Sequence, residues 1–471
     1  MLNQLATQRT LPFAIVALLA LHAAPAGAGI HWGDITAKGC VSGKTGLQLY
    51  SAILWDIPSG ASWEKACRET KATINHVDYP EPTRCITKDH MWGEWDVPDM
   101  TCGPLVTSDP FTLVIASDTQ VWSWHRNDHA VQSKSKKVGD PGDGCQIGET
   151  YHEKCSQAAN EDQFSAMGKV QMLRWPDTPH VIRDRHDKPV PRPVGVAING
   201  DLTEFFHPRQ IDEFQRLIDR HKEDLLGMQL LLGLGNHDYF NNLCDCRGHS
   251  PFDSMSCARN AVYRMHERYG NAGWIVFDKN SSAYSFDFGN YHFAQLNLTP
   301  IYEVQFDGLS ASGAVGSPEH QQCLNESRTL RAADKGSYRQ IASGLPWLTS
   351  DLTEAQDKRI VLFMHAANDP GYWSNQRAAT AFRELLAKVN VVAIFAGHYH
   401  GLYGDQTKER TEWVNKAGQK IPLFLSGSSE YRKFLVAEFG ETYLIVGVVD
   451  STDGKATFFS SANQEMLRSY P

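Results

Sequence analysis

The sequence lacks the features that mark several large classes of protein. Its 45 basic residues are outnumbered by 54 acidic ones, and the net charge of −9 excludes a broad basic surface for wrapping nucleic acid. Beyond the signal-like start described next, no apolar run reaches the roughly 18 residues that a membrane span requires. No repeat of fixed period and no glycine-rich dinucleotide-binding loop occurs. With 42% hydrophobic residues among 471, these absences leave a globular chain whose length favours two domains.

Charge is also scarce at the start of the chain, where Arg9 is the only charged residue before Asp34. An apolar stretch over residues 11–24 leads into small residues at 26–28. This pattern is typical of a secretory signal peptide. We therefore predict that residues 1–28 are cleaved, and that the mature chain is secreted or periplasmic without a transmembrane segment. An uncleaved membrane anchor is the alternative, and the short core interrupted by Pro12 disfavours it.

An exported chain meets an oxidising compartment, where its ten cysteines are expected to form disulfides. Their positions divide them into three even groups, within which the sequence does not choose the connectivity. A zinc site that includes Cys244 and Cys246 is the rival, although this pair lacks the two-residue spacer of common zinc knuckles. The groups are Cys40, Cys67, Cys85 and Cys102; Cys145 and Cys155; and Cys244, Cys246, Cys257 and Cys323.

Residues 29–105 differ in composition from the rest of the chain. They contain four cysteines and five tryptophans and show no apolar periodicity of helical length. We predict a small, loop-rich domain held by disulfides, followed by a second domain over residues 106–471. The tryptophans are expected mainly in a core. The alternative is a role in contacting a surface, a glycan or a lipid.

From residue 111 onward, short apolar runs alternate with amphipathic segments. Each run is bounded by turn residues and is typical of a strand buried on both faces. Residues 209–225 and 377–389 keep a helical spacing of apolar positions, and the stretch after Phe434 predicts further strands. This alternation predicts an α/β domain, in which we expect 126–193 and 303–320 to be long excursions. The predicted strands are 111–116, 194–198, 230–234, 360–364, 391–396 and 422–425.

Each of these strands except the last ends in a polar cluster. Since α/β sheets bind ligands at the carboxyl ends of their strands, we expect the clusters to converge. Their carboxylate, amide and imidazole groups are the ligands that a pair of divalent metals would take. The clusters are 117–120 (SDTQ), 199–201 (NGD), 235–238 (GNHD), His365 and 397–400 (GHYH).

This series of motifs resembles that of the calcineurin-like metallophosphoesterases over about residues 111–430. The resemblance implies a four-layer αββα sandwich, with the strands after Phe434 completing the second sheet. It also implies that His237 faces the leaving group and that Asp238 orients His237. One metal would be held by Asp118, Gln120, Asp201 and His400, and the second by the bridging Asp201 with Asn236, His365 and His398.

Gln120 departs from the family pattern, which has a histidine at this place. An amide oxygen in place of an imidazole nitrogen makes the first site a harder set of ligands, of the kind that binds hard cations. Among the divalent metals considered, the sequence therefore favours Mn, Mg or Ca over Fe or Zn.

We expect a phosphate-ester substrate, with monoesters hydrolysed by a hydroxide that two divalent metals activate and His237 acting as general acid. A phosphodiesterase acting on phospholipid or nucleotide diesters is the alternative within the same chemistry. A catalytically weak secreted binding protein is the alternative from another class, in which Gln120 impairs one metal site.

Overall fold

The structure is a computed structural model. Its described residues fall into two compact units. One unit comprises the described residues up to Lys38 together with Tyr50–Trp95, and the other comprises Gly39–Leu49 and Asp96–Pro471. The predicted signal peptide lies outside the described residues. These are 29–41, 46–75, 77–103, 110–121, 153–204, 206, 208–238, 256–305, 340–367, 369–410, 413–459 and 467–470.

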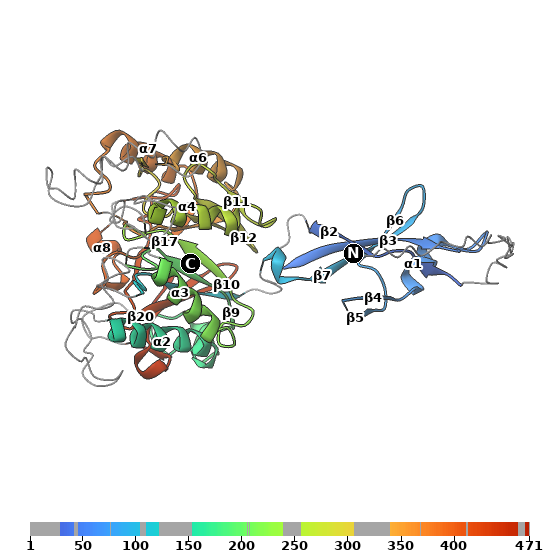
Figure 1. The fold of residues 1–471 in the computed structure, drawn as a ribbon, viewed down its shortest axis with the longest axis horizontal. Helices are drawn as coiled ribbons and strands as arrows, with labels where there is room; N and C mark the ends of the chain where they lie inside the picture. The colour runs from blue at the N-terminus through green and yellow to red at the C-terminus, as the bar shows by residue number, and fades with distance from the viewer. Residues whose placement is uncertain are drawn as a thin grey trace, which may run out of the picture. The chain divides into compact units, whose positions relative to one another are not determined.

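The residues before position 104 form mainly strands, shown in blue in Figure 1. A five-stranded sheet has the order β1-β3-β7-β6, with β2 paired to β3. A second, two-stranded sheet pairs β4 with β5. The elements are β1 (His31–Trp32), β2 (Thr36–Cys40), β3 (Leu47–Trp55), α1 (Trp63–Glu69), β4 (Ala72–Ile74), β5 (Val77–Tyr79), β6 (Arg84–Thr87) and β7 (Met91–Pro98).

The prediction of a loop-rich region is therefore wrong for these residues. Strand β7 alternates strictly, with buried side chains at Met91, Trp95 and Val97 and less buried ones between them. Such alternation is typical of a strand with one buried face. Trp95 is fully buried and meets Trp32 edge to face, with ring centroids 4.8 Å apart. Trp55 remains 43% exposed, so the tryptophans are divided between core and surface.

Two disulfides resolve the first cysteine group. Cys40 pairs with Cys102 and Cys67 pairs with Cys85. Cys155 is also disulfide-bonded. The predicted pairings of the other cysteines stay predictions, because Cys145, Cys244, Cys246 and Cys323 lie outside the described residues and the side chain of Cys257 is not described.

The second unit contains two seven-stranded sheets. The first has the order β10-β9-β8-β20-β21-β22, with β23 also paired to β21. In it β8, β9 and β10 run parallel, whereas β20 and β21 are antiparallel to their neighbours. Its strands are β8 (Phe111–Ala116), β9 (Pro193–Asn199), β10 (Gln229–Gly233), β20 (Lys433–Phe439), β21 (Leu444–Asp450), β22 (Thr457–Phe458) and β23 (Leu467–Tyr470).

The second sheet has the order β11-β12-β13-β16-β17-β19-β18, and its central strands β13, β16, β17 and β19 run parallel. A separate pair joins β14 (Val304–Gln305) to β15 (Gln340–Ile341). The strands of the sheet are β11 (Val276–Phe277), β12 (Tyr284–Phe288), β13 (Tyr291–Gln295), β16 (Arg359–Phe363), β17 (Val391–Ala396), β18 (Tyr403–Asp405) and β19 (Leu423–Ser426).

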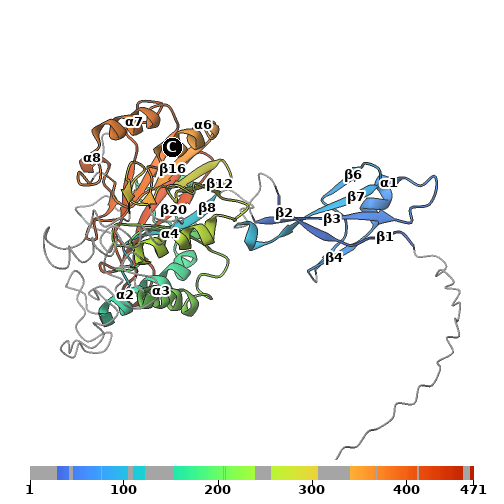
Figure 2. The same cartoon turned by 45° about the horizontal axis from the view of Figure 1, so that its top comes forward.

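Helices cover the outer faces of the two sheets. Figures 1 and 2 show α6 and α7 on one side of the sheets and α2 and α3 on the other. Helix α4 is linked to β10 by the Tyr269 hydroxyl, which accepts from the Leu232 amide. The helices are α2 (Glu153–Lys169), α3 (Pro208–Arg220), α4 (Ser256–Tyr269), α6 (Leu345–Glu354), α7 (Gln376–Leu386) and α8 (Thr407–Arg410), with short 3-10 turns at Met100–Cys102, Val170–Met172, Arg183–Arg185 and Thr452–Gly454.

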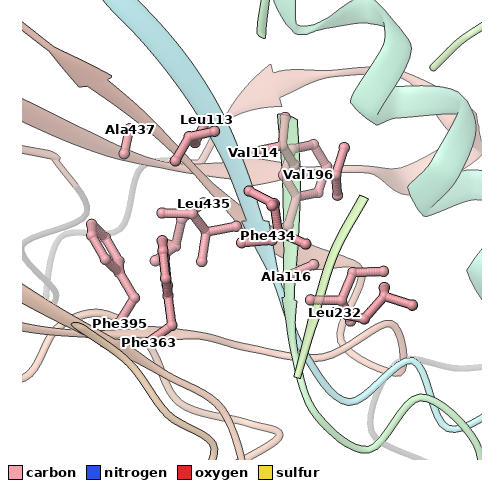
Figure 3. Close-up of a cluster of buried hydrophobic side chains, with 14 of the residues drawn as sticks. Leu113, Val114, Ala116, Val196, Leu232, Phe363, Phe395, Phe434, Leu435 and Ala437 are labelled. Atoms are coloured by element: carbon pink, nitrogen blue, oxygen red, sulfur yellow. The ribbon is translucent and has the colours of Figure 1, made fainter. Parts of the chain in front are cut away.

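The main core lies between the two sheets. Phe363 and Phe395 of the second sheet meet Leu435 of the first in one buried cluster (Figure 3). A second cluster packs α6 and α7 against the far side of β16 and β17, through residues such as Phe382 and Leu362. The predicted αββα sandwich is thereby confirmed, as are the six predicted strands, within one residue at each end. Both predicted helices are present, but α3 ends five residues and α7 three residues earlier than predicted.

One predicted excursion is partly wrong. The stretch 126–193 contains the helix α2, which covers the first sheet. Polar side chains on its buried face explain why no apolar period marks it. Asn160 and Gln163 are almost fully buried and donate to the backbone carbonyls of Thr119 and Lys433. Among the described residues, no helix is long and apolar enough to cross a membrane.

Candidate metal centre and active site

The carboxyl ends of the parallel strands bring most of the predicted ligands together. Asp118 follows β8, Asp201 follows β9, and His365 and His398 follow β16 and β17. Two groups have their ligand atoms within 4.8 Å of one another, and Asp201 belongs to both. The groups are Asp118, Asp201 and His400, and Asp201, His365 and His398.

Tight backbone approaches shape this edge. A Cβ atom on Gly235 would lie 2.1 Å from the Asp201 carboxylate, and one on Gly397 would lie 2.7 Å from that of Asp118. Glycine is therefore required at both places. Asp118, Asp201 and His398 themselves adopt positive φ angles of 52°, 53° and 71°. Such backbone angles are costly for residues with a side chain, and they cluster at functional sites.

Asp118 is almost fully buried. Its Oδ2 accepts from the Ser117 hydroxyl and from the His398 amide, the latter at 2.9 Å. Its Oδ1 has no aligned hydrogen-bond donor among the described residues, although Nε2 of His400 lies 3.3 Å away. Burial opposes ionisation of this carboxyl, but the charges of His365 and His400 outweigh it and lower the pKa of Asp118.

Asp201 and His365 form a second buried pair. Oδ1 of Asp201 accepts from the His237 amide at 2.8 Å, and Oδ2 lies 3.0 Å from Nε2 of His365. Nδ1 of His365 donates to the carbonyl of Asn199 at 2.7 Å. Burial opposes charge on this ring, but Asp201 and Asp118 raise the pKa of His365 to about 9. Burial likewise opposes ionisation of Asp201, and His365 reverses this and lowers the pKa of Asp201.

Two buried atoms without an aligned hydrogen-bond partner among the described residues show whether these residues fit a metal. Oδ1 of Asp118 and Nε2 of His365 are buried and lack an aligned hydrogen-bond partner in the described part of the chain. Buried polar atoms are normally satisfied, so such exceptions call for a further partner. A carboxylate oxygen and an imidazole nitrogen are ordinary ligands of divalent cations. The residues present therefore fit the metal ions that the sequence predicts.

In both His398 and His400, one ring nitrogen faces an oxygen of another predicted ligand, and the other nitrogen faces an acidic residue outside the predicted set. In His398, Nδ1 lies 3.1 Å from Oδ1 of Asn236 and Nε2 lies 2.7 Å from Oδ2 of Asp369. In His400, Nε2 faces Asp118 and Nδ1 lies 3.1 Å from Oε2 of Glu430. Burial opposes charge on His400, but Asp118 raises the pKa of that ring to about 11. Burial and the charge of His365 lower the pKa of His398.

His237 lies beside the same cluster and is partly exposed. Its Nδ1 donates to the carbonyl oxygen of Glu204 at 3.0 Å, and Oε1 of Glu204 is 3.6 Å away. Burial opposes charge on the ring, but Asp201 and Glu204 raise the pKa of His237. Glu204 thus supplies a contact that holds the imidazole.

Asp238 makes a different set of contacts. Its Oδ1 accepts from the amides of Leu202 and Thr203 at 3.0 and 3.3 Å, and its Oδ2 accepts from the Gly235 amide at 2.8 Å. Burial raises the pKa of Asp238 to about 8, and the charge of Asp201 adds to this. These contacts tie the turns after β9 and β10 together. The orienting role predicted for Asp238 stays a prediction, and Glu204 is a further residue that contacts the imidazole of His237.

Gln120 lies at the same edge. The backbone amide of Gln120 donates to the backbone carbonyl of Asp201 at 2.9 Å, and the backbone carbonyl of Gln120 accepts from the Ser156 hydroxyl at 3.1 Å. The residue is buried, with a φ of 35°. The backbone of Gln120 therefore adjoins Asp201, and its role as a metal ligand stays a prediction.

Three acidic residues that contact histidines of the site, Glu204, Asp369 and Glu430, are not among the predicted site residues. Glu430 follows β19, the one predicted strand to which no polar cluster was assigned. Residues 426–430 (SGSSE) form such a cluster, and this signal could have placed Glu430 at the site. Asp369 lies in the loop after His365, where its Asn-Asp-Pro-Gly sequence is explained equally well by a contact at the site and by an ordinary surface turn.

An αββα sandwich that gathers carboxylates and imidazoles at its strand ends defines a class of metal-dependent hydrolase. The family model described as calcineurin-like phosphoesterase matches residues 112–402, which is more than half of the chain. The chain belongs to this family. It is a metal-dependent phosphoesterase, a hydrolase that acts on phosphoric esters, and its family typically uses two divalent metals.

Three solved bacterial structures match the chain weakly. A phosphoesterase-like protein of Streptococcus pneumoniae is 11% identical, with a TM-score of 0.24, 75% of this chain covered and 100% of the other. The calcineurin-like phosphoesterase YfkN of Bacillus subtilis is 10% identical, with a TM-score of 0.29 and coverage of 77% and 90%. TT1561 of Thermus thermophilus is 7% identical, with a TM-score of 0.31 and coverage of 74% and 98%. No curated protein matches the chain.

Proposed function

We propose that this chain is a secreted phosphatase that hydrolyses phosphate monoesters at a two-metal site. One observation carries the proposal: two groups of carboxylate and imidazole ligands share Asp201, and the buried atoms Oδ1 of Asp118 and Nε2 of His365 lack aligned partners in the described chain. Asp118, Gln120, Asp201 and His400 would hold one divalent ion, and Asp201, Asn236, His365 and His398 the second.

Bound metals supply a water activated at neutral pH and positive charge for the phosphoryl oxygens. The chain's own residues prepare the place for them. Oδ1 of Asp201 accepts from the amide of His237, and Oδ2 lies 3.0 Å from Nε2 of His365, so this carboxylate stands where the two proposed groups of ligands meet.

His237 would donate a proton to the leaving alkoxide. The carbonyl of Glu204 can only accept, so Nδ1 of His237 carries a proton, and Nε2 is the nitrogen directed away from that contact. A proton on Nε2 is the one available to the leaving group. Asp238 would support this indirectly, since its backbone contacts fix the turns that present Asp201 and His237.

Two further parts of the proposal follow from ligand and cysteine chemistry. A donor set dominated by carboxylate and amide oxygens with imidazole, and without thiolate, favours Mn, Mg or Ca over Fe or Zn. The disulfides Cys40–Cys102 and Cys67–Cys85 are compatible with an extracellular or periplasmic location. A glycan or lipid contact through residues 29–105 stays a prediction.

The test is hydrolysis of nitrophenyl phosphate and of bis(nitrophenyl) phosphate by the full chain, with Mn, Mg, Ca, Zn or chelator. We expect metal-dependent turnover, faster on the monoester. Asn236→Ala should lower kcat/KM by more than about 100-fold, because the second ion loses a ligand. The matched control is Asn290→Ala, in the exposed turn between β12 and β13, which should retain wild-type activity.

Each alternative has its own outcome in this experiment. Preference for the diester would replace the monoesterase assignment with a phosphodiesterase one. Absence of metal-dependent turnover on every ester would favour the weak binding protein, and it would sink the proposed monoesterase.

A further inference from the structure

We propose that Asp369 and Glu430 are positioning residues of the metal centre, each fixing one ligand histidine and adding negative charge behind it. Asp369 serves His398, and Glu430 serves His400. The inference rests on the proposed assignment of these two histidines as metal ligands.

Asp369 is itself held in place. Its Oδ2 accepts from Nε2 of His398 at 2.7 Å, while its Oδ1 accepts from the Gly371 amide at 2.8 Å. The Asp369 carbonyl accepts from the Tyr372 amide at 3.0 Å. The ring of Tyr372 in turn packs edge to face on His398, with centroids 5.6 Å apart. Both carboxylate oxygens of Asp369 are thus engaged, and the same loop contacts the His398 ring twice.

Glu430 reaches the site from a different direction. It stands in the turn after β19, and its Oε2 accepts from Nδ1 of His400 at 3.1 Å. The preceding Ser429 donates from its hydroxyl to the carbonyls of Asp118 and Thr119 at 3.3 and 3.1 Å. The turn that carries Glu430 is therefore tied to the backbone of the first predicted ligand.

These contacts set the tautomer that each ring adopts as a metal ligand. A carboxylate accepts a hydrogen bond, so the nitrogen facing Asp369 or Glu430 carries the proton, and in the neutral ring that binds a metal the opposite nitrogen offers its lone pair. In His398 that opposite nitrogen is Nδ1, which faces Oδ1 of Asn236. In His400 it is Nε2, which faces Oδ1 of Asp118. Each lone pair thus points toward an oxygen of the same proposed metal site, where a shared cation stabilises both donors.

The three ligand histidines differ in what stands behind them. His365 donates to the neutral carbonyl of Asn199, whereas His398 and His400 face carboxylates. A carboxylate behind an imidazole raises its basicity and strengthens the bond to a metal. Each proposed ion therefore has one such pair, and Glu430 adds its charge to the ion for which Gln120 offers only a neutral amide.

The test measures metal affinity and stability in the full chain after removal of metal by a chelator. Mn²⁺ is titrated into the wild type, Asp369→Asn and Glu430→Gln by calorimetry, and thermal unfolding is followed with and without Mn²⁺. We expect wild type to bind two Mn²⁺ and each variant to bind one of them about 10–100-fold more weakly. The metal-free midpoint should stay unchanged, and the upward shift caused by Mn²⁺ should shrink.

The matched control is Asp177→Asn. Asp177 contacts His186 at 2.6 Å, a histidine–carboxylate pair that is not part of the metal centre. This variant should bind Mn²⁺ as wild type does. Wild-type affinity in both site variants, or an equal loss of stability with and without metal, would overturn the positioning roles alone. A wild type that binds no Mn²⁺ would instead overturn the metal-site assignment on which the inference rests.

Discussion

Gly235 and Asp201 stand in such close contact that a Cβ atom at position 235 would lie 2.1 Å from Oδ1 of the carboxylate. Oδ1 is also the atom that accepts from the His237 amide. Any side chain at position 235 would therefore displace the residue shared by both ligand groups.

The substitution Gly235→Ala tests this dependence. We expect loss of Mn²⁺ binding and a fall in kcat/KM of more than about 100-fold, because the shared ligand must move away from its partners. The measurements are calorimetric metal titration and hydrolysis of nitrophenyl phosphate. Gly344→Ala is the control, since its nearest neighbour is the Ser281 hydroxyl at 3.1 Å, a group that can rotate. Normal metal binding in Gly235→Ala would show that Asp201 is not the shared ligand.

Removal of metal should abolish hydrolysis without unfolding the chain. The core between the two sheets is built from apolar side chains such as Phe363, Phe395 and Leu435, and none of these depends on an ion. Metal at 100 times its Kd should add about 2.7 kcal/mol to the unfolding free energy. Circular dichroism and thermal unfolding, recorded before and after dialysis against a chelator, check this. Complete loss of secondary structure would show that the ions hold the fold.

His237→Gln should affect esters according to their leaving groups. An alkoxide is a poor leaving group and needs a proton, whereas nitrophenolate leaves without one. We expect kcat on an alkyl phosphate to fall by about 10²–10⁴-fold, and kcat on nitrophenyl phosphate to fall much less. His186→Gln, which alters a histidine not assigned to the active site, serves as the control. Equal losses on both substrates would remove the general-acid role from His237.

The convergence of Asp118, Asp201, His365, His398 and His400 could be predicted because each one follows a strand that the apolar pattern already identified. Asp118 and His365, for example, stand two residues after the last residue of β8 and β16. Parallel pairing then forces such positions to one edge. The same logic could not find Asp369, because its contact with His398 depends on the path of a loop, which no periodicity encodes.

Hydrogen bonding also explains why the sequence pattern did not predict helix α2 within residues 126–193. Helix α2 covers the first sheet partly through Ser156, Asn160 and Gln163, which donate to backbone carbonyls of neighbouring segments. A helix anchored in this way has no apolar stripe for a pattern to detect. The polar contacts of its buried face can be recognised only in the folded structure, because their partners are distant in the sequence.

The stability of the chain should also depend on pH through a histidine remote from the metal site. His292 on β13 lies between two carboxylates, with Nδ1 2.9 Å from Asp287 and Nε2 2.8 Å from Asp351. Burial opposes charge on the ring, but the two carboxylates outweigh it and raise the pKa of His292 to about 9. Because the folded pKa exceeds the unfolded value of about 6.5, the folded state holds this proton more tightly.

The stabilisation from His292 is therefore complete below pH about 6.5 and is lost as the pH rises through about 9. We expect the unfolding free energy of wild type to fall by on the order of 1–3 kcal/mol over this range, because His292 loses its charge. Urea unfolding at several pH values measures this. His292→Gln should show a flatter profile, whereas His186→Gln should keep the wild-type slope. If His292→Gln retained the full slope, the pH dependence would have to come from other groups.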